Sequence, residues 1–182
     1  GEGGLFVTVD DIDSFVKVRE IRPEQVRTLL DVSGLLPMAE ADVKRAICAI
    51  VEEQYEQRDW GGERSELYTT RLQYRGRRLS TAMLLKGPAA GPVLYPSNLG
   101  KRGDQLLRLF TEPAELFILQ FNGRIDSSVT EQFRRYGRDR AAFGQPVLLC
   151  VIDGVDTAGL LSADGCLMAN GSIPTDANQF AN

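Results

Sequence analysis

The chain has 182 residues, of which 43% are hydrophobic and 25% are charged, and it contains no histidine. This composition is typical of a single globular domain, and the lack of histidine excludes Ser-His-Asp and Cys-His catalysis and histidine-ligated zinc. Any enzyme chemistry must therefore use carboxylates, a lysine and, where needed, a metal ion.

The net charge of −4 is unevenly distributed along the chain. Residues 1–66 carry 15 acidic and 8 basic residues, residues 67–140 carry 6 and 13, and residues 141–182 carry 4 and none. A basic middle section can bind a polyanion even when the whole chain is acidic. The alternative is that these arginines are solvated side chains on helix surfaces.

The three cysteines, Cys48, Cys150 and Cys166, are far apart and lack metal-binding or redox spacing. Cys48 and Cys150 lie in apolar segments and are expected to be small core residues. No apolar run reaches the length of a membrane span and no signal peptide is visible, so we expect a cytoplasmic protein that does not enter a membrane.

The pattern along residues 1–40 predicts a helical extension that packs on the core, with a helix beginning near Pro23 and ending at Gly34. The core, residues 41–170, begins with a helix from Ala41 to about Arg58. The further elements are strands at 66–74 and 78–86, a short helix at 103–110, a strand at 115–121, a helix capped by Asp126 and ending near Ala142, a strand at 146–152 and a short helix after it. Residues 171–182 are predicted to be a flexible tail.

An antiparallel hairpin followed by alternating helices and strands predicts an α/β (α+β) fold. We expect a mixed β-sheet, with the hairpin as part of it, flanked by helices on both faces.

The register of the hairpin decides where a candidate site lies. If Gly76 is the centre of a three-residue loop, Glu66 lies opposite Lys86 at the open end of the hairpin. If Arg75 and Gly76 form a two-residue turn, Glu66 lies opposite Leu85, on the other face from Lys86. The first register places Glu66 and Lys86 on one face, either as part of a site or as a structural ion pair.

Three further polar residues are expected near this end of the sheet. Glu63 precedes the first strand, and Asp104 and Gln105 open the helix after the Gly/Pro loop. Carboxylates bind hard cations such as Mg²⁺ or Mn²⁺, and a lysine stabilises charge on a phosphate. The hypothesis is a phosphodiesterase site with Glu66, Lys86, Glu63, Asp104 and Gln105 as catalytic residues, the metal being held by Glu66, Glu63 and Asp104. Asp104 can equally be a helix cap.

The segments "DWGGERSELYTTRL", "TAMLLKG", "LGKRGDQLLRLF", "AELFILQFNG" and "IDGVDTAGLL" together resemble small bacterial proteins of the restriction-endonuclease-like, PD-(D/E)XK superfamily, over about residues 40–165. The resemblance implies a mixed sheet with an antiparallel hairpin, and Lys86 as the motif lysine. The motif acid is expected two residues earlier, where Leu84 stands. In a second alignment Gln120 takes the place of the acid and Asn122 that of the lysine.

The resemblance favours a metal-dependent nuclease or a nuclease-derived domain that binds nucleic acid, active in DNA processing or defence. Phosphate contacts are expected from Lys101, Arg102, Arg108 and Arg124. The missing acid favours the alternative, a catalytically inactive interaction or sensing module with the same fold, acting as a homodimer or with a protein partner.

Overall fold

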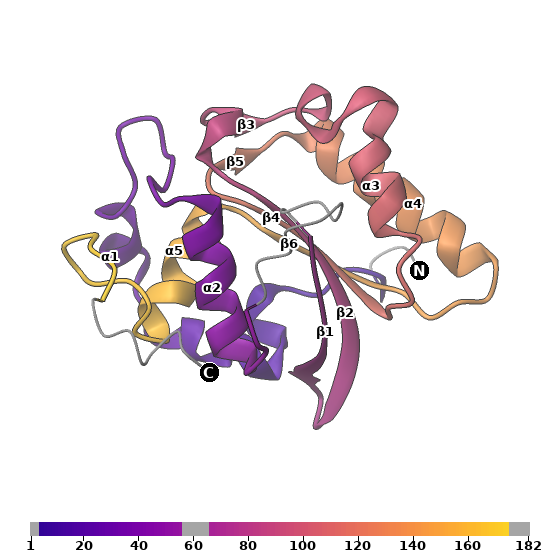
Figure 1. Ribbon diagram of the computed structural model, residues 1–182, viewed down its shortest axis with the longest axis horizontal. Coiled ribbons are helices and arrows are strands. Elements are labelled where there is room, and N and C mark those ends of the chain that lie inside the picture. The colour runs from indigo at the N-terminus through magenta and orange to yellow at the C-terminus, as the bar shows by residue number, and fades with distance from the viewer. Residues whose placement is uncertain (1–3, 56–65, 175–182) are drawn as a thin grey trace.

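The computed structural model describes residues 4–55 and 66–174. Its centre is a four-stranded sheet of order β1-β2-β4-β6, in which β1 and β2 are antiparallel and β2, β4 and β6 are parallel (Figure 1). The strands are β1 Glu66–Tyr74, β2 Arg77–Lys86, β4 Leu116–Phe121 and β6 Leu148–Ile152, and a separate two-stranded sheet is formed by β3 Val93–Leu94 and β5 Arg124–Ile125. The predicted mixed α/β sheet is confirmed.

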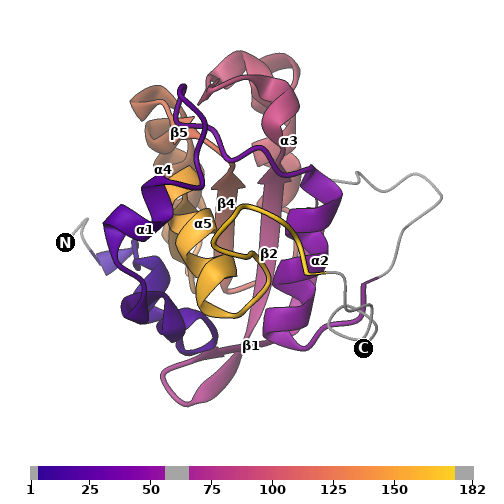
Figure 2. The ribbon, with the colours of Figure 1, turned by 90° about the vertical axis from the view of Figure 1, so that its left-hand side faces the viewer.

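Helices cover both faces of the sheet (Figures 1 and 2). On one face lie α2 and α5, together with α1 and the N-terminal 3-10 helices, and on the other face lie α3 and α4. The bounds are α1 Pro23–Arg27, α2 Glu40–Val51, α3 Asp104–Leu109, α4 Ser127–Ala142 and α5 Gly154–Ala163, with the longer 3-10 helix at Asp13–Glu20. In the described part of the chain no helix is both long and apolar enough to cross a membrane.

Alternating side chains of the strands divide the core into two hydrophobic clusters. Met83, Leu85 and Ile118 pack toward α2 and α5, whereas Leu84 and Phe117 pack toward α3 and α4. Cys48 and Cys150 are buried in the first cluster, as predicted. Burial raises the pKa of the Cys48 thiol to about 11 and also raises that of Cys150, so both stay protonated at neutral pH.

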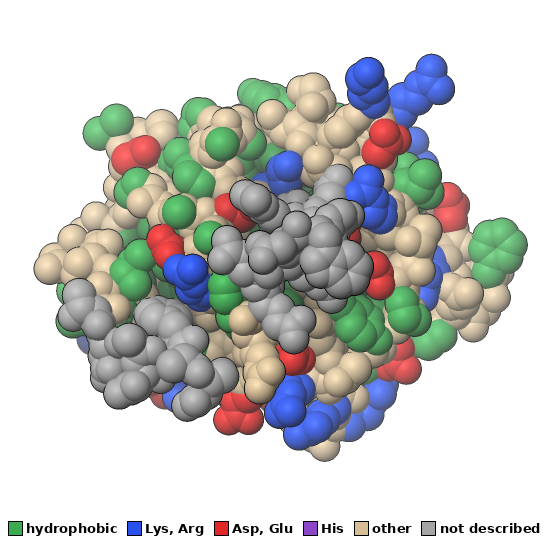
Figure 3. Space-filling view, in the orientation of Figure 1, with side chains coloured by type: hydrophobic (Ala, Val, Ile, Leu, Met, Phe, Trp, Pro, Cys, Tyr) green, Lys and Arg blue, Asp and Glu red, His purple; other side chains and the backbone are tan. Residues whose placement is uncertain are grey.

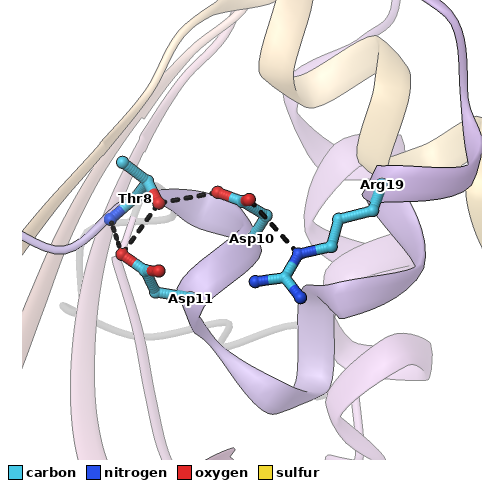
Figure 4. A network of polar contacts seen from close by, with 4 residues as sticks. All are labelled: Thr8, Asp10, Asp11 and Arg19. Carbon is cyan, nitrogen blue, oxygen red and sulfur yellow. Dashed lines mark hydrogen bonds and ion pairs between the residues drawn. The ribbon is translucent and has the colours of Figure 1, made fainter.

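The N-terminal segment is held to the core at the outer edge of β6. Val7 N–H donates to the Leu149 carbonyl (2.8 Å), and Leu149 N–H donates to the Leu5 carbonyl (2.7 Å). The next turn is closed by Thr8, whose N–H donates to Asp11 (2.9 Å) and whose hydroxyl shares its hydrogen between Asp10 (2.6 Å) and Asp11 (2.8 Å). Arg19 Nε also donates to Asp10 (3.3 Å; Figure 4). These bonds lower the pKa of both carboxyl groups. The short 3-10 turns here were not predicted, because the apolar stripe that marks a longer helix is missing.

Two predicted helix ends are wrong. The helix that begins at Pro23 ends at Arg27 and not at Gly34. The first core helix does not continue to Arg58 but ends at Val51, because Glu52 adopts a left-handed conformation (φ 62°) that turns the chain out of the helix. The hairpin loop, for which the sequence left a three-residue and a two-residue alternative open, has the second form. It is the two-residue turn Arg75-Gly76, with φ of 48° and 78°, as in a type I′ turn.

Candidate functional site

Strand β2 ends at Lys86 because the following residues cannot continue it. Gly87 N–H donates to Glu40 Oε1 at the start of α2 (3.1 Å), and a Cβ at position 87 would lie 2.7 Å from the Glu40 Cβ. Pro88 then has no N–H to give to the sheet. Lys86 is half-buried, and its Nζ donates to Gln105 Oε1 in α3 (3.0 Å). The structure therefore brings together Lys86 and Gln105, two of the predicted site residues.

Glu66 pairs with neither residue that the two predicted registers assign to it; it lies opposite Leu84. The two-residue turn shifts the pairing by one position, and a bulge between Thr69 and Leu72 shifts it by one more. Since opposed residues share a face, and so do residues two apart on a strand, Glu66 and Lys86 still lie on the same face and at the same end of the hairpin. They are diagonal neighbours, with Cβ atoms about 7–8 Å apart in such a position.

Asp104 is exposed at the first turn of α3, and no side chain caps this helix, whose N-cap residue is Gly103. The chain reaches the helix through left-handed conformations at Gly100 (φ 84°), Arg102 (φ 57°) and Gly103 (φ 74°). Arg102 is strained there, since the left-handed region costs a residue with a Cβ about 1 kcal/mol or more. The predicted role of Asp104 as a cap is therefore not observed.

Glu66 lines a pocket of about 290 Å³ at the β1 edge of the sheet, together with Lys44 and Glu53 from the α2 side and Leu109 and Glu112 from the end of α3. Sequence reasoning missed Lys44 and Glu112, which lie in segments without a motif. Glu53 is held in place there, because its Oε2 accepts a hydrogen bond from the Thr69 hydroxyl (2.8 Å).

The structure describes two of the three predicted metal ligands, Glu66 and Asp104. Asp104 begins α3, and Leu109, which lines the same pocket as Glu66, ends it; five residue steps along a helix span about 7.5 Å. Glu63 lies outside the described residues. Within residues 4–55 and 66–174 there is no group of three or more His, Cys, Asp or Glu residues that could hold a metal ion. Because Glu63 lies outside the described residues, the Mg²⁺ or Mn²⁺ site stays a prediction.

The residues of the second alignment lie on the opposite face and have structural partners. Gln120 Nε2 donates to Asn122 Oδ1 (3.0 Å) and to Thr157 Oγ1 of α5 (3.0 Å). Asn122 Nδ2 donates to the carbonyls of Leu36 (3.1 Å) and Met38 (2.7 Å). Gln120 and Asn122 are both buried, so this buried amide network fixes residues 36–38 over the carboxyl end of β4.

The four predicted phosphate contacts, Lys101, Arg102, Arg108 and Arg124, are all exposed, and we call them the basic rim. Lys101 and Arg102 lead into α3, Arg108 lies one turn further along it, and Arg124 follows the end of β4, where Phe121 pairs with Lys86. Arg124 has one acidic neighbour, Asp126, at 4.0 Å. Basic side chains gather over the start of α3 at the upper right of Figure 3. The rim therefore borders the carboxyl ends of β2 and β4.

Comparisons with protein-family models, with curated proteins and with solved structures found no match to this chain.

Proposed function

We propose that this chain is a nucleic-acid-binding module that holds backbone phosphates on the basic rim. The observation that carries the proposal is the exposure of all four rim cations at one end of the sheet, beside the half-buried Lys86. Between Glu66 and Asp104 the sequence contains no acidic residue, so little negative charge from this stretch opposes a phosphate. Lysine and arginine contacts to phosphates position a protein on nucleic acid without reading its sequence.

Lys86 differs from the rim residues because its position is fixed. Its stem is half-buried at the end of β2, and Gln105 accepts its hydrogen bond. An ammonium group that is already oriented loses less conformational entropy on binding an anion than a freely rotating one does. We assign Lys86 as the ordered phosphate contact and the exposed rim as its surroundings.

The test is fluorescence anisotropy with a short labelled DNA duplex and the matching RNA, titrated at increasing salt. Each phosphate contact contributes roughly −0.9 to the log–log slope on duplex DNA. We expect Lys101→Ala/Arg102→Ala to weaken binding about tenfold and to reduce the slope by about two. The matched control is Arg22→Ala/Arg27→Ala, which removes the same charge from exposed positions on α1 and beside it.

Equal losses in the rim variant and the control would mean that only net charge matters, and would contradict the proposal. The same would follow if the unmodified protein bound neither DNA nor RNA at about 50 mM salt, where phosphate contacts are strong. Incubating the same substrates with magnesium or manganese tests the nuclease hypothesis. Cleavage that Lys86→Ala abolishes would replace the binding proposal with a catalytic one.

A further inference from the structure

The turn of the β1–β2 hairpin extends beyond the rest of the sheet. Leu116, the first residue of β4, pairs with Thr81, and Glu115 N–H donates to the Ser80 carbonyl (2.9 Å). Among the described residues, the part of β2 from Arg77 to Leu79 has no backbone partner on the β4 side. Figures 1 and 2 show this end of the hairpin as a two-stranded ribbon that projects from the body of the molecule. We call residues Arg71–Arg78 the hairpin tip.

The hairpin tip is strongly basic. Its four arginines, Arg71, Arg75, Arg77 and Arg78, are exposed, and it contains no acidic residue. Arg77 pairs with Glu115 (3.2 Å), whereas the other three form no ion pair within 4.0 Å among the described residues. Basic side chains gather at the lower edge of Figure 3, over this hairpin.

The tip is held rigidly although its sequence does not suit the turn. Gly76 N–H donates to Asp13 Oδ2 (2.8 Å), and Gln73 N–H donates to Ser14 Oγ (2.8 Å), so the N-terminal 3-10 helix fixes the turn from one side. Asp13 is therefore an acidic group at the tip. Asn, Asp or Gly is favoured at the first turn position, where this chain has Arg75 in a left-handed conformation.

An unfavourable residue at a well-anchored turn points to a function for its side chain. The Arg75 guanidinium lies over the Tyr74 ring, 5.4 Å from its centre. Such stacking uses the face of the guanidinium and leaves its N–H donors available for a phosphate.

We propose that the hairpin tip is a second nucleic-acid contact, which binds the backbone of a duplex about one helical turn away from the basic rim. This inference rests on the proposed function. The tip and the rim lie at opposite ends of β2, whose nine residue steps span about 30 Å at roughly 3.3 Å each. One turn of B-DNA is roughly 34 Å long, so a single duplex along the molecule meets both regions. A two-stranded ribbon is also narrow enough to enter the major groove.

The test compares three double variants with the unmodified protein on a long duplex. The hairpin variant is Arg75→Asn/Arg78→Gln, where Asn suits the turn and Arg77 keeps its pair with Glu115. The rim variant is Lys101→Gln/Arg102→Gln, and the control is Arg22→Gln/Arg27→Gln. We expect about tenfold weaker binding and a salt slope reduced by about two for the hairpin variant, with unchanged melting and an unaffected control. On a duplex shorter than one turn, the hairpin variant is expected to match the unmodified protein.

The outcomes separate this inference from the proposed function. If only the rim variant loses affinity, the hairpin contact is excluded and the rim proposal stands. If only the hairpin variant loses affinity, the hairpin contact stands and the rim proposal fails. If no nucleic acid binds, both fail. Polyglutamate, which mimics an acidic protein partner, serves as a competitor of the duplex. If it displaces the duplex when both are present at the same concentration of negative charge, the tip recognises charge alone, and the assignment to nucleic acid is overturned.

Discussion

At the carboxyl end of β2, Lys86 lies half-buried toward α3 with one hydrogen bond to Gln105, next to exposed cations. At the carboxyl end of the adjacent strand β4, Gln120 and Asn122 are buried beneath residues 36–38 and α5. Both ends carry polar side chains in apolar strands, yet only the first is accessible to a ligand. A polar residue at the end of a buried strand therefore signals either a site or a structural network, and its burial and partners tell the two apart.

The largest effect on stability is expected at the buried carboxyl end of β4. Asn122→Ala removes two hydrogen bonds to backbone carbonyls and one from Gln120; the Leu36 carbonyl keeps its bond from Met38 N–H, whereas the Met38 carbonyl and Gln120 each lose a partner. We expect a cost of about 3 kcal/mol of unfolding free energy. Chemical denaturation measures this cost. Asn170→Ala, at an exposed position, is the control and should change stability little. A cost below about 1 kcal/mol would contradict the structural role of the network.

The next effect depends on pH and concerns α5, which covers the carboxyl end of β4. Burial, followed by the nearby Asp153 and Asp10, raises the pKa of Asp156 from 3.8 to about 7. The folded protein therefore binds more protons than the unfolded chain in this window, and the unfolding free energy should fall as pH rises from about 4 to about 7.

A shift of about three pKa units at about 1.4 kcal/mol each would give about 4 kcal/mol. Because Asp156 and its neighbouring carboxyl groups titrate together, we expect a smaller loss, on the order of 2 kcal/mol. Asp156→Asn should flatten most of this slope in denaturation experiments at several pH values. Some slope should remain, because burial also raises the pKa of Asp164. An unchanged pH slope in Asp156→Asn would show that Asp156 is not the titrating group. The control Asp139→Asn, at an exposed position, is expected to leave the slope unchanged.

At the accessible carboxyl end of β2, the effect of a substitution on stability should be smaller. Lys86→Met keeps the apolar stem and removes one half-buried hydrogen bond, so we expect a loss of about 1 kcal/mol or less, together with weaker nucleic-acid binding. Thermal melts and anisotropy on the same sample measure both. If the loss of stability approached that of Asn122→Ala, Lys86 would belong to the structural network and the comparison of the two strand ends would fail.

The smallest effect on stability is expected at Arg102. Arg102→Gly relieves a left-handed conformation, worth about 1 kcal/mol, but glycine also loses more conformational entropy on folding, about 0.5–1 kcal/mol. Stability should therefore change by about 0.5 kcal/mol or less, while the salt slope of binding falls by roughly one. A normal slope in this variant would remove Arg102 from the phosphate contacts.

The sequence predicted the elements of the core well because their apolar patterns are long. It did not predict the register of the hairpin, since a bulge leaves no periodic signal and each single-residue shift moves side chains to the other face. The shared face of Glu66 and Lys86 was expected from a register that is wrong. It is nevertheless observed, because the turn and the bulge together shift the pairing by two residues.

The buried amide network could be anticipated only in part. Gln120 within an apolar strand indicates a buried polar group that needs partners. Its partner Asn122 bonds to residues more than eighty positions earlier, and no local pattern connects segments so distant in the sequence. The metal hypothesis likewise joined Glu66 to Asp104 only by their places in the chain. In the structure Asp104 begins α3, whereas Glu66 lines a pocket with Leu109 at the end of that helix.

The outer edge of β6 has a consequence for behaviour in concentrated solution. Among the described residues, the backbone partners of that edge are Leu5 and Val7, which bond to Leu149. If this short segment detaches, an apolar strand exposes unpaired N–H and C=O groups, which is the template on which strands of other molecules add. Self-association of this protein through edge pairing would therefore start at β6, remote in sequence from the basic rim and the hairpin tip, and would be governed by the residues that hold the N-terminal segment in place.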